Sequence, residues 1–125
     1  MKSGSCLCKK ISYQVNGPLR PITACHCTQC RKQSGHFFAA TAAHNDDLTI
    51  QGEDNLTWFH ASKDAERGFC KFCGSTLFWR HAEEDFTSIL AGSLDGKTGL
   101  KIAKHIFVAD KGDYYEIEGD VQQTS

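Results

Sequence analysis

Seven cysteines in three tight clusters constrain this 125-residue chain more than any other feature. The clusters are Cys6-Leu7-Cys8, Cys25-His26-Cys27-Thr28-Gln29-Cys30 and Cys70-Lys71-Phe72-Cys73. Cysteines two or three positions apart can direct their sulfurs toward one point, as a bound metal requires. A disulfide framework needs no such short steps, and an odd number of cysteines cannot all be paired. The clusters therefore predict a zinc protein with thiolate ligands.

The seven sulfurs divide naturally into four and three. Structural zinc is almost always closed by four ligands, whereas catalytic zinc keeps three protein ligands and one open position. The first pair, placed two apart on an extended strand, would put both sulfurs on one face, and the last pair would lie on a turn. We therefore expect a structural zinc held by Cys6, Cys8, Cys70 and Cys73. The second zinc, with catalytic duty, would be held by Cys25, Cys27 and Cys30.

The cysteines have two other interpretations. One of them groups Cys6 and Cys8 with two of the three middle cysteines, and it stays open because spacing alone does not fix connectivity. A redox role for Cys70 and Cys73 would need a βαβ context. Here a strand-like run at 67–69 precedes the pair and another follows it, with no helical pattern nearby.

Length and charge limit the remaining possibilities. A chain of 125 residues predicts one domain, 1–125, large enough to bury about two thirds of its unfolded surface. The formal net charge of −1 argues against a nucleic-acid partner, which would usually need a basic stripe. The first residues have no apolar run typical of a secretory signal, and the apolar stretch near 37–43 is far too short to span a membrane. Free thiolates without an export signal predict a cytoplasmic location.

Short β-prone runs recur along the chain, at 11–15, 48–50, 56–59, 76–80, 86–91, 105–108 and 114–117. The runs at 48–50 and 56–59 flank a polar segment, which predicts a hairpin with a longer loop. The one plausible helix has Thr28 as its N-cap, runs over 29–34 and ends at Gly35. Residues 120–125 resemble a frayed tail. The pattern predicts a mainly β domain of short antiparallel sheets, held by zinc, with one short helix.

These motifs follow the order of one known family. They are the segments 3–8, 11–13, 25–35 and 67–77, then Gly92-Ser93-Leu94-Asp95 and His105. The chain resembles the glutathione-dependent formaldehyde-activating family, also called the CENP-V/GFA domain, over residues 3–118. The resemblance implies an Mss4-like fold of mostly antiparallel sheets. It also implies the same division of ligands, with the four outer cysteines structural and the middle three catalytic.

The activity implied by the resemblance is condensation of glutathione with formaldehyde to S-(hydroxymethyl)glutathione, formally a carbon–sulfur lyase run in reverse. A three-thiolate zinc suits that chemistry, since its open position can bind a thiol, lower the thiol pKa or polarise a carbonyl. The partners would be a small thiol such as glutathione and a small aldehyde. The alternative is a zinc-stapled binding or adaptor module without catalysis, which would show an exposed apolar patch. The oligomeric state is left open.

Four departures from the family pattern replace no predicted ligand. Lys9 stands where a glycine usually follows the first cysteine pair, 96–98 replaces a common proline, no proline precedes His105, and Tyr114-Tyr115 takes the place of a tryptophan. Because these positions fall where loops shape a pocket, the thiol substrate is left open.

Three further residues have two interpretations each. His26 lies between two ligands and is expected to point away from them, in support of the site or at the surface. His105 is either a structural histidine or a pocket residue. Arg67 would pair with a substrate carboxylate or with a nearby acidic side chain.

Overall fold

Strands supply most of the regular structure of the computed structural model, which describes residues 1–125 and confirms the predicted mainly β class. The strands are β1 (Lys2–Ser5), β2 (Ser12–Val15), β3 (Ile22–Cys25), β4 (Phe38–His44), β5 (Leu48–Gln51), β6 (Leu56–His60), β7 (Ala65–Cys70), β8 (Thr76–His81), β9 (Phe86–Leu90), β10 (Ile102–Ile106) and β11 (Gln122–Gln123). The single α-helix, as predicted, is short: α1 (Thr28–Ser34). Four 3-10 turns complete the set: η1 (Asn45–Asp47), η2 (Glu53–Asn55), η3 (Ala91–Ser93) and η4 (Val108–Asp110). No helix has the length and apolar character needed to cross a membrane.

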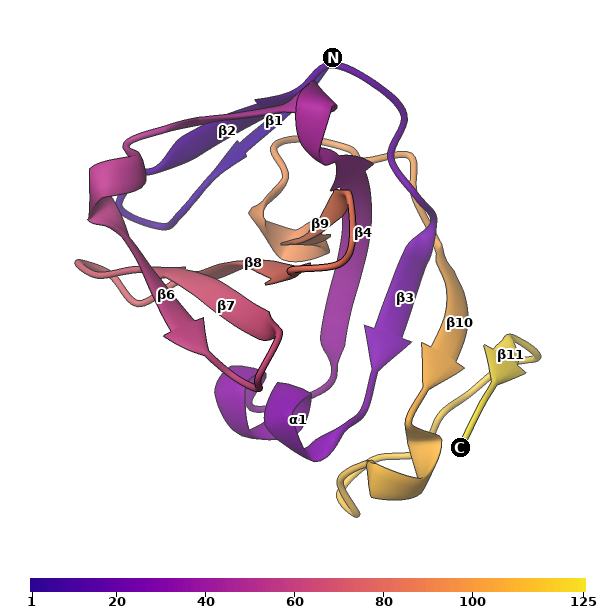
Figure 1. Cartoon of the computed structure of the whole chain (residues 1–125). Helices are drawn as coiled ribbons and strands as arrows, with labels where there is room; N and C mark the ends of the chain where they lie inside the picture. The colour runs from indigo at the N-terminus through magenta and orange to yellow at the C-terminus, as the bar shows by residue number, and fades with distance from the viewer.

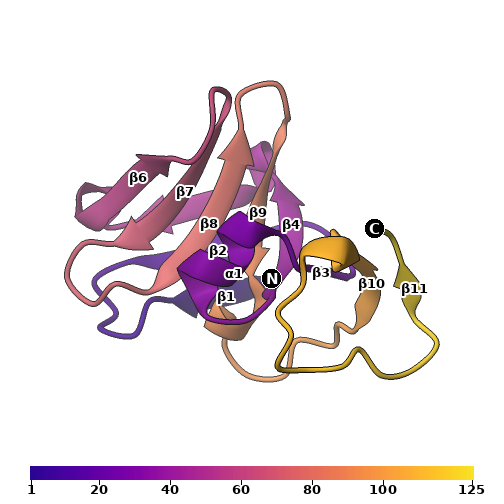
Figure 2. The same cartoon turned by 90° about the horizontal axis from the view of Figure 1, so that it is seen from below.

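The strands form two sheets. The smaller has three strands in the order β1-β2-β5, and the larger has eight in the order β11-β10-β3-β4-β9-β8-β7-β6. All pairings are antiparallel except those of β10 with β3 and with β11. In Figure 1, β1 and β2 lie at the upper left, and the larger sheet curves from β6 round to β11. α1 lies at the lower end of this sheet, and Figure 2 views the molecule from that end.

The main core combines side chains of both sheets. Tyr13 and Val15 of β2 are fully buried with Phe78 of β8 and Ile89 of β9. The rings of Tyr13 and Phe78 meet edge to face with centroids 5.4 Å apart. Because strand side chains alternate, the neighbouring residue Trp79 faces the other side of the larger sheet. One face of that sheet thus packs in the core, and the other is free to line a site.

The predicted hairpin over 48–59 is wrong. β5 pairs with β2 in the small sheet, whereas β6 pairs with β7 in the large one. Gly52 and the turn η2 carry the chain from one sheet to the other, and Gly52 has a φ of 81°. A side chain there would collide with the carbonyl oxygen of Lys10, so a glycine is needed for the two segments to approach this closely. Local sequence signals a turn at this point but does not say which strand the next segment joins.

The C-terminal part also differs from its prediction. The run at 114–117 forms no strand, and Gln122–Gln123, placed in the predicted frayed tail, forms β11 beside β10. The tail is anchored further by the Thr124 N–H, which donates to the carbonyl oxygen of His105. The C-terminal segment therefore packs along β10, close to the end of β3.

Candidate metal centres and their cavity

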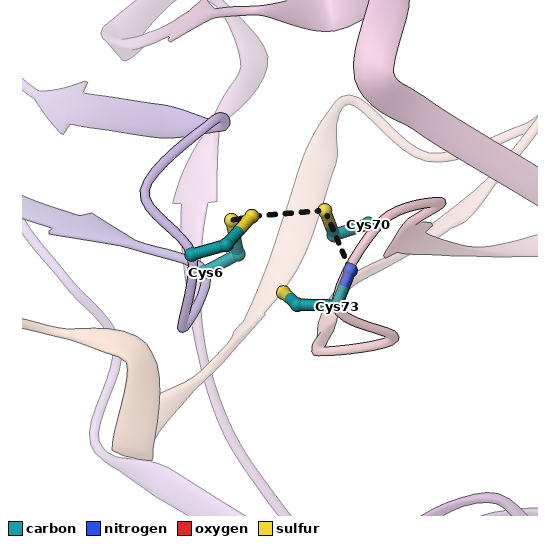
Figure 3. A group of neighbouring side chains, drawn as sticks. Cys6, Cys70 and Cys73 are labelled. Carbon is teal, nitrogen blue, oxygen red and sulfur yellow. Dashed lines mark hydrogen bonds between the residues drawn. The ribbon is translucent and has the colours of Figure 1, made fainter.

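Four cysteine sulfurs converge where the turn after β1 meets the turn between β7 and β8. Figure 3 shows Cys6 on one loop facing Cys70 and Cys73 on the other. The four sulfurs, including that of Cys8, all lie within 4.8 Å of one another. The Cys8 sulfur is 3.6 Å from that of Cys6 and 3.7 Å from that of Cys70. Tetrahedral zinc with Zn–S bonds of about 2.3 Å separates its sulfurs by about 3.8 Å, so these positions fit one zinc ion.

Backbone and hydroxyl donors surround this site as thiolates require. The N–H groups of Phe72 and Cys73 donate to the Cys70 sulfur at 3.4 and 3.5 Å. Hydrogen bonds from the Ser75 hydroxyl and backbone lower the pKa of Cys73 to about 5. Ligand thiols must lose their protons to bind a metal, and the donors at Cys70 and Cys73 favour that loss.

The Cys6–Cys8 segment corrects one premise of the sequence analysis. These cysteines lie in the turn that follows β1 rather than on an extended strand. The turn needs Lys9 at a φ of 66°, in the left-handed region that a glycine enters without steric cost. This explains physically why a glycine suits the position where the chain has Lys9.

The middle cluster forms a second group of sulfurs at the junction of β3 and α1. β3 ends at Cys25, and the sulfurs of Cys25, Cys27 and Cys30 all lie within 4.8 Å of one another. The predicted N-cap, Thr28, is wrong by one residue. Cys27 caps the helix, because its sulfur accepts the N–H of Cys30 at 3.3 Å. The helix ends at Gly35 as predicted, with a φ of 83°.

The structure groups the cysteines as four and three. Cys6 and Cys8 lie with the Cys70 pair and not with the middle cluster, so the alternative grouping is not the one formed. Either group of sulfurs could hold a metal ion. His26 is not among the clustered ligand atoms.

Arg67 contacts the three-cysteine group directly. Its side chain is 4 % exposed, and its Nη2 donates to the Cys30 sulfur at 3.4 Å. Its Nη1 donates to the Gln33 amide oxygen at 2.9 Å, and Nη2 also lies 3.4 Å from that of Gln29. No acidic side chain pairs with it, so the predicted local ion pair is absent. The spacing of the two glutamines, four apart on one helix, was the sequence signal that they share a face.

The three thiols do not share their protons evenly. A hydrogen bond from the Cys25 thiol, and then the Arg67 guanidinium, lower the pKa of Cys30 to about 6. The same bond to Cys30, together with burial, raises the pKa of Cys25. The first negative charge of the group therefore resides on Cys30, held by a buried cation.

A cavity of about 570 Å³ opens beside this group, on the sheet face opposite to the core. Trp79 is paired with Ser88 on one side and with Arg67 on the other, so the three share one face of the sheet. All three line the cavity, together with the middle cysteines. Apolar walls come from Phe38, Trp79, Phe86, Ile106 and Phe107. Trp79 and Phe86 are not among the predicted site residues, although their strands alternate as a two-faced sheet requires.

Hydrogen-bonded polar side chains surround His26, which lies between two cysteines of the three-cysteine group. The His26 ring is fully buried, with Nε2 at 2.9 Å from Nδ1 of His105 and Nδ1 at 2.5 Å from the hydroxyl of Tyr115. Burial, and then the neighbouring His105, lower the pKa of His26. Neither histidine lines the cavity, so the structural interpretation of His105 holds and His26 supports the site. Tyr115 was missed because nothing local links it to residues 89 positions away.

Comparison with known proteins places this geometry in a family. The sequence model described as "Glutathione-dependent formaldehyde-activating enzyme" (GFA) matches residues 1–110. The chain belongs to the GFA family. The predicted resemblance is thereby confirmed, and the match spans both groups of cysteines.

Two relatives show how far the similarity extends. An uncharacterized lyase of Schizosaccharomyces pombe, C29B12.13, is 28 % identical over 114 residues, covering 90 % of this chain and 82 % of the relative. A crystal structure of a Rhodobacter sphaeroides protein superposes with a TM-score of 0.64 at 26 % identity, covering 78 % of this chain and 91 % of that one.

Proposed function

We propose that this chain is a zinc-dependent carbon–sulfur lyase-like enzyme that acts on a thiol–aldehyde adduct, similar to S-(hydroxymethyl)glutathione synthase. The observation that carries the proposal is the three-cysteine group in the wall of a cavity, backed by Arg67. Membership of the GFA family and similarity to a protein named as a lyase support the same reaction class. In this proposal, a zinc held by Cys25, Cys27 and Cys30 is the catalytic ion, and the four-cysteine site holds a structural one.

The reaction joins a thiol and an aldehyde. The thiol sulfur forms a bond to the carbonyl carbon, the carbonyl π bond becomes a lone pair on oxygen, and the thiol proton moves to that oxygen. The reverse reaction breaks the carbon–sulfur bond. A zinc ion held by Cys25, Cys27 and Cys30 would keep one position open, and its Lewis acidity would lower the pKa of a substrate thiol or polarise the aldehyde carbonyl.

The protein residues around this position do three things. Arg67 donates to Cys30 and fixes the negative charge of the cysteine group. Gln29 and Gln33 accept from Arg67 and orient its guanidinium. The apolar side chains of Phe38 and Trp79 exclude water, which strengthens every electrostatic interaction in the cavity.

The structure gives the adaptor alternative less support. Large apolar side chains are exposed at scattered positions: Met1, Leu7, Phe59, Phe72, Phe107 and Tyr114. Single exposed apolar residues are normal on protein surfaces and need no partner. A cavity that contains three clustered thiols and a buried arginine, by contrast, has the features of a reaction site.

Exchange NMR tests the proposal. Freshly purified, zinc-containing protein is mixed with formaldehyde and glutathione, and exchange between free aldehyde and its thiol adduct is followed above the spontaneous rate. We expect the wild type to accelerate exchange. The Cys25→Ser/Cys27→Ser/Cys30→Ser variant should leave exchange at the spontaneous rate. An Arg80→Gln variant is the matched control, since Arg80 lies at the surface against Trp58 and Glu66. Equal acceleration by the triple variant would overturn the assignment of the site.

A further inference from the structure

The cavity contains a second arginine that the proposed chemistry does not use. Arg20 lines the cavity, and its Nε is buried without a hydrogen-bond partner. Its Nη2 donates to the carbonyl oxygen of Ala40 at 3.2 Å, and none of the ion pairs of the structure involves it. A guanidinium carries five N–H donors in a fixed fork, so most of the donors of Arg20 have no protein acceptor.

The backbone around Arg20 is held firmly. Its N–H donates to the carbonyl oxygen of Ala42 at 3.1 Å, and its own carbonyl oxygen accepts from the Thr41 hydroxyl at 2.5 Å. Pro21 follows directly and restricts the conformation of Arg20 further. The position is therefore set by β4 before any ligand binds, which keeps the ordering cost of a ligand contact low.

The environment of Arg20 favours an anion. Burial lowers the pKa of this guanidinium, so its charge is partly desolvated without compensation. Arg67, the other cavity arginine, already donates to Cys30 and two glutamines through its Nη atoms, although its Nε also has no partner. Asp110 is the one acidic residue of the cavity wall, and it forms no ion pair with Arg20. One unpaired cation matches a monoanionic carboxylate, which a guanidinium binds through two parallel hydrogen bonds.

Strand register gives the separation along β3 and β4 between the level of Ala40, whose carbonyl oxygen holds this cation, and the level of Cys25. Cys25 is paired with Phe38, and Thr23 with Ala40, the residue that holds the Arg20 guanidinium. The two levels are two strand residues apart, or about 7 Å. A short carbon chain bearing a carboxylate, extended by one hydrogen bond of about 2.8 Å, spans such a distance. Phe38, which lies at the level of Cys25, supplies apolar surface for that carbon chain.

We propose that Arg20 determines the specificity of the site for thiols that carry a carboxylate, by pairing with that carboxylate while the sulfur lies at the three-cysteine group. The position of the sulfur rests on the proposed function, whereas the pairing of Arg20 with a carboxylate does not. Arg20 is thus a selecting residue in the binding cavity and takes no part in bond formation.

A non-reacting probe tests the pairing by itself. Zinc-containing protein is titrated with 3-(methylthio)propionate and with its neutral amide, and the Nε–Hε signal of Arg20 is followed by NMR. We expect the acid, and not the amide, to shift this signal in the wild type. The acid should bind roughly tenfold or more weakly to Arg20→Gln, as expected for a lost charge-assisted hydrogen bond, with an intermediate loss in Arg20→Lys. Arg80→Gln, which removes a charge from the opposite face of β8, should bind as the wild type does.

Two outcomes would overturn the inference: an unmoved Arg20 signal, or equal binding of acid and amide. If Arg20→Gln fails to fold, the Nε–Hε signal of the wild type and the affinity of Arg20→Lys for the acid still test the pairing.

Thiol exchange separates this inference from the proposed function. Loss of the preference for 3-mercaptopropionate over its amide in Arg20→Gln, while Arg80→Gln keeps that preference, supports both. Exchange without any such preference in the wild type contradicts the inference alone. Arg20-dependent binding without thiol exchange contradicts the proposed function alone.

Discussion

Arg67 and Cys30 form the contact on which the residue-scale account depends. Arg67 is 4 % exposed, and its guanidinium lies 3.4 Å from a thiol sulfur and has no carboxylate partner. Burying a cation without an anion is unfavourable, so the arrangement is stable when Cys30 is a thiolate. The two residues are 37 positions apart, and the sequence identified each of them without indicating that they meet.

The first prediction concerns the charge on Cys30. In protein whose three-cysteine group is metal-free, alkylation of Cys30 by iodoacetamide should rise with pH through about 6, where its thiol loses the proton. Arg67→Gln removes a donor to the thiolate, so the pKa rises and alkylation at pH 6 falls roughly fivefold. Tandem mass spectrometry assigns the modified cysteine.

Arg80→Gln serves as the control, because it removes one positive charge from a side chain that contacts Glu66 and Trp58. An unchanged rate in Arg67→Gln, or an equal fall in both variants, would show that Arg67 does not stabilise the thiolate.

At the scale of elements, the C-terminal segment supports the junction of β3 and α1. His26 lies between two cysteines, and its ring bonds to His105 of β10 and to Tyr115. The His26 N–H also donates to the carbonyl oxygen of Ile106. β10, β3 and the segment after η4 are therefore connected through one buried imidazole. This arrangement holds the cysteine junction in place although α1 has only seven residues.

The second prediction follows from this connection. Tyr115→Phe leaves a ring nitrogen of His26 without its partner in a buried site, which costs about 1 to 2 kcal/mol of unfolding free energy. For a domain of this length, we expect the melting temperature to fall by roughly 5 °C. Tyr114→Phe, which removes an exposed hydroxyl, should change it little. A melting temperature that is equal in Tyr115→Phe and the wild type would contradict the supporting role.

For the whole molecule, the four-cysteine site joins the two sheets. Cys6 and Cys8 follow a strand of the small sheet, whereas Cys70 and Cys73 belong to the turn between two strands of the large one. The contact between Cys8 and Cys70 closes a loop of 62 residues. A metal that bridges such a loop constrains the unfolded chain strongly.

The third prediction is that Cys73→Ser unfolds the domain or makes it insoluble. Structural zinc contributes on the order of 10 kcal/mol to folding, which is comparable with the whole stability of a domain of this size. Circular dichroism and thermal melting check it. A soluble Cys73→Ser protein that melts cooperatively at the wild-type temperature would contradict a structural role for the site.

The sequence predicted the parts of this molecule that local spacing controls. The three cysteine clusters, the end of α1 at Gly35 and the mainly β class all follow from short-range rules. The division of the clusters into four and three came instead from the coordination numbers of zinc and from the family resemblance. The strand partners of 48–51 and 56–60 did not follow, because pairing depends on residues far away in the chain. For the same reason, no local pattern indicated that Tyr115 contacts His26 or that Arg20 contacts Ala40.

Zinc stoichiometry tests the central claim, two metal sites of different kinds, most directly. Native mass spectrometry of freshly purified protein should give two zinc ions per chain in the wild type. The Cys25→Ser/Cys27→Ser/Cys30→Ser variant should keep one zinc and its cooperative fold, because its three ligands come from one short segment and join no sheets. A single zinc in the wild type that the triple variant retains would contradict the claim, as would a triple variant that holds no zinc.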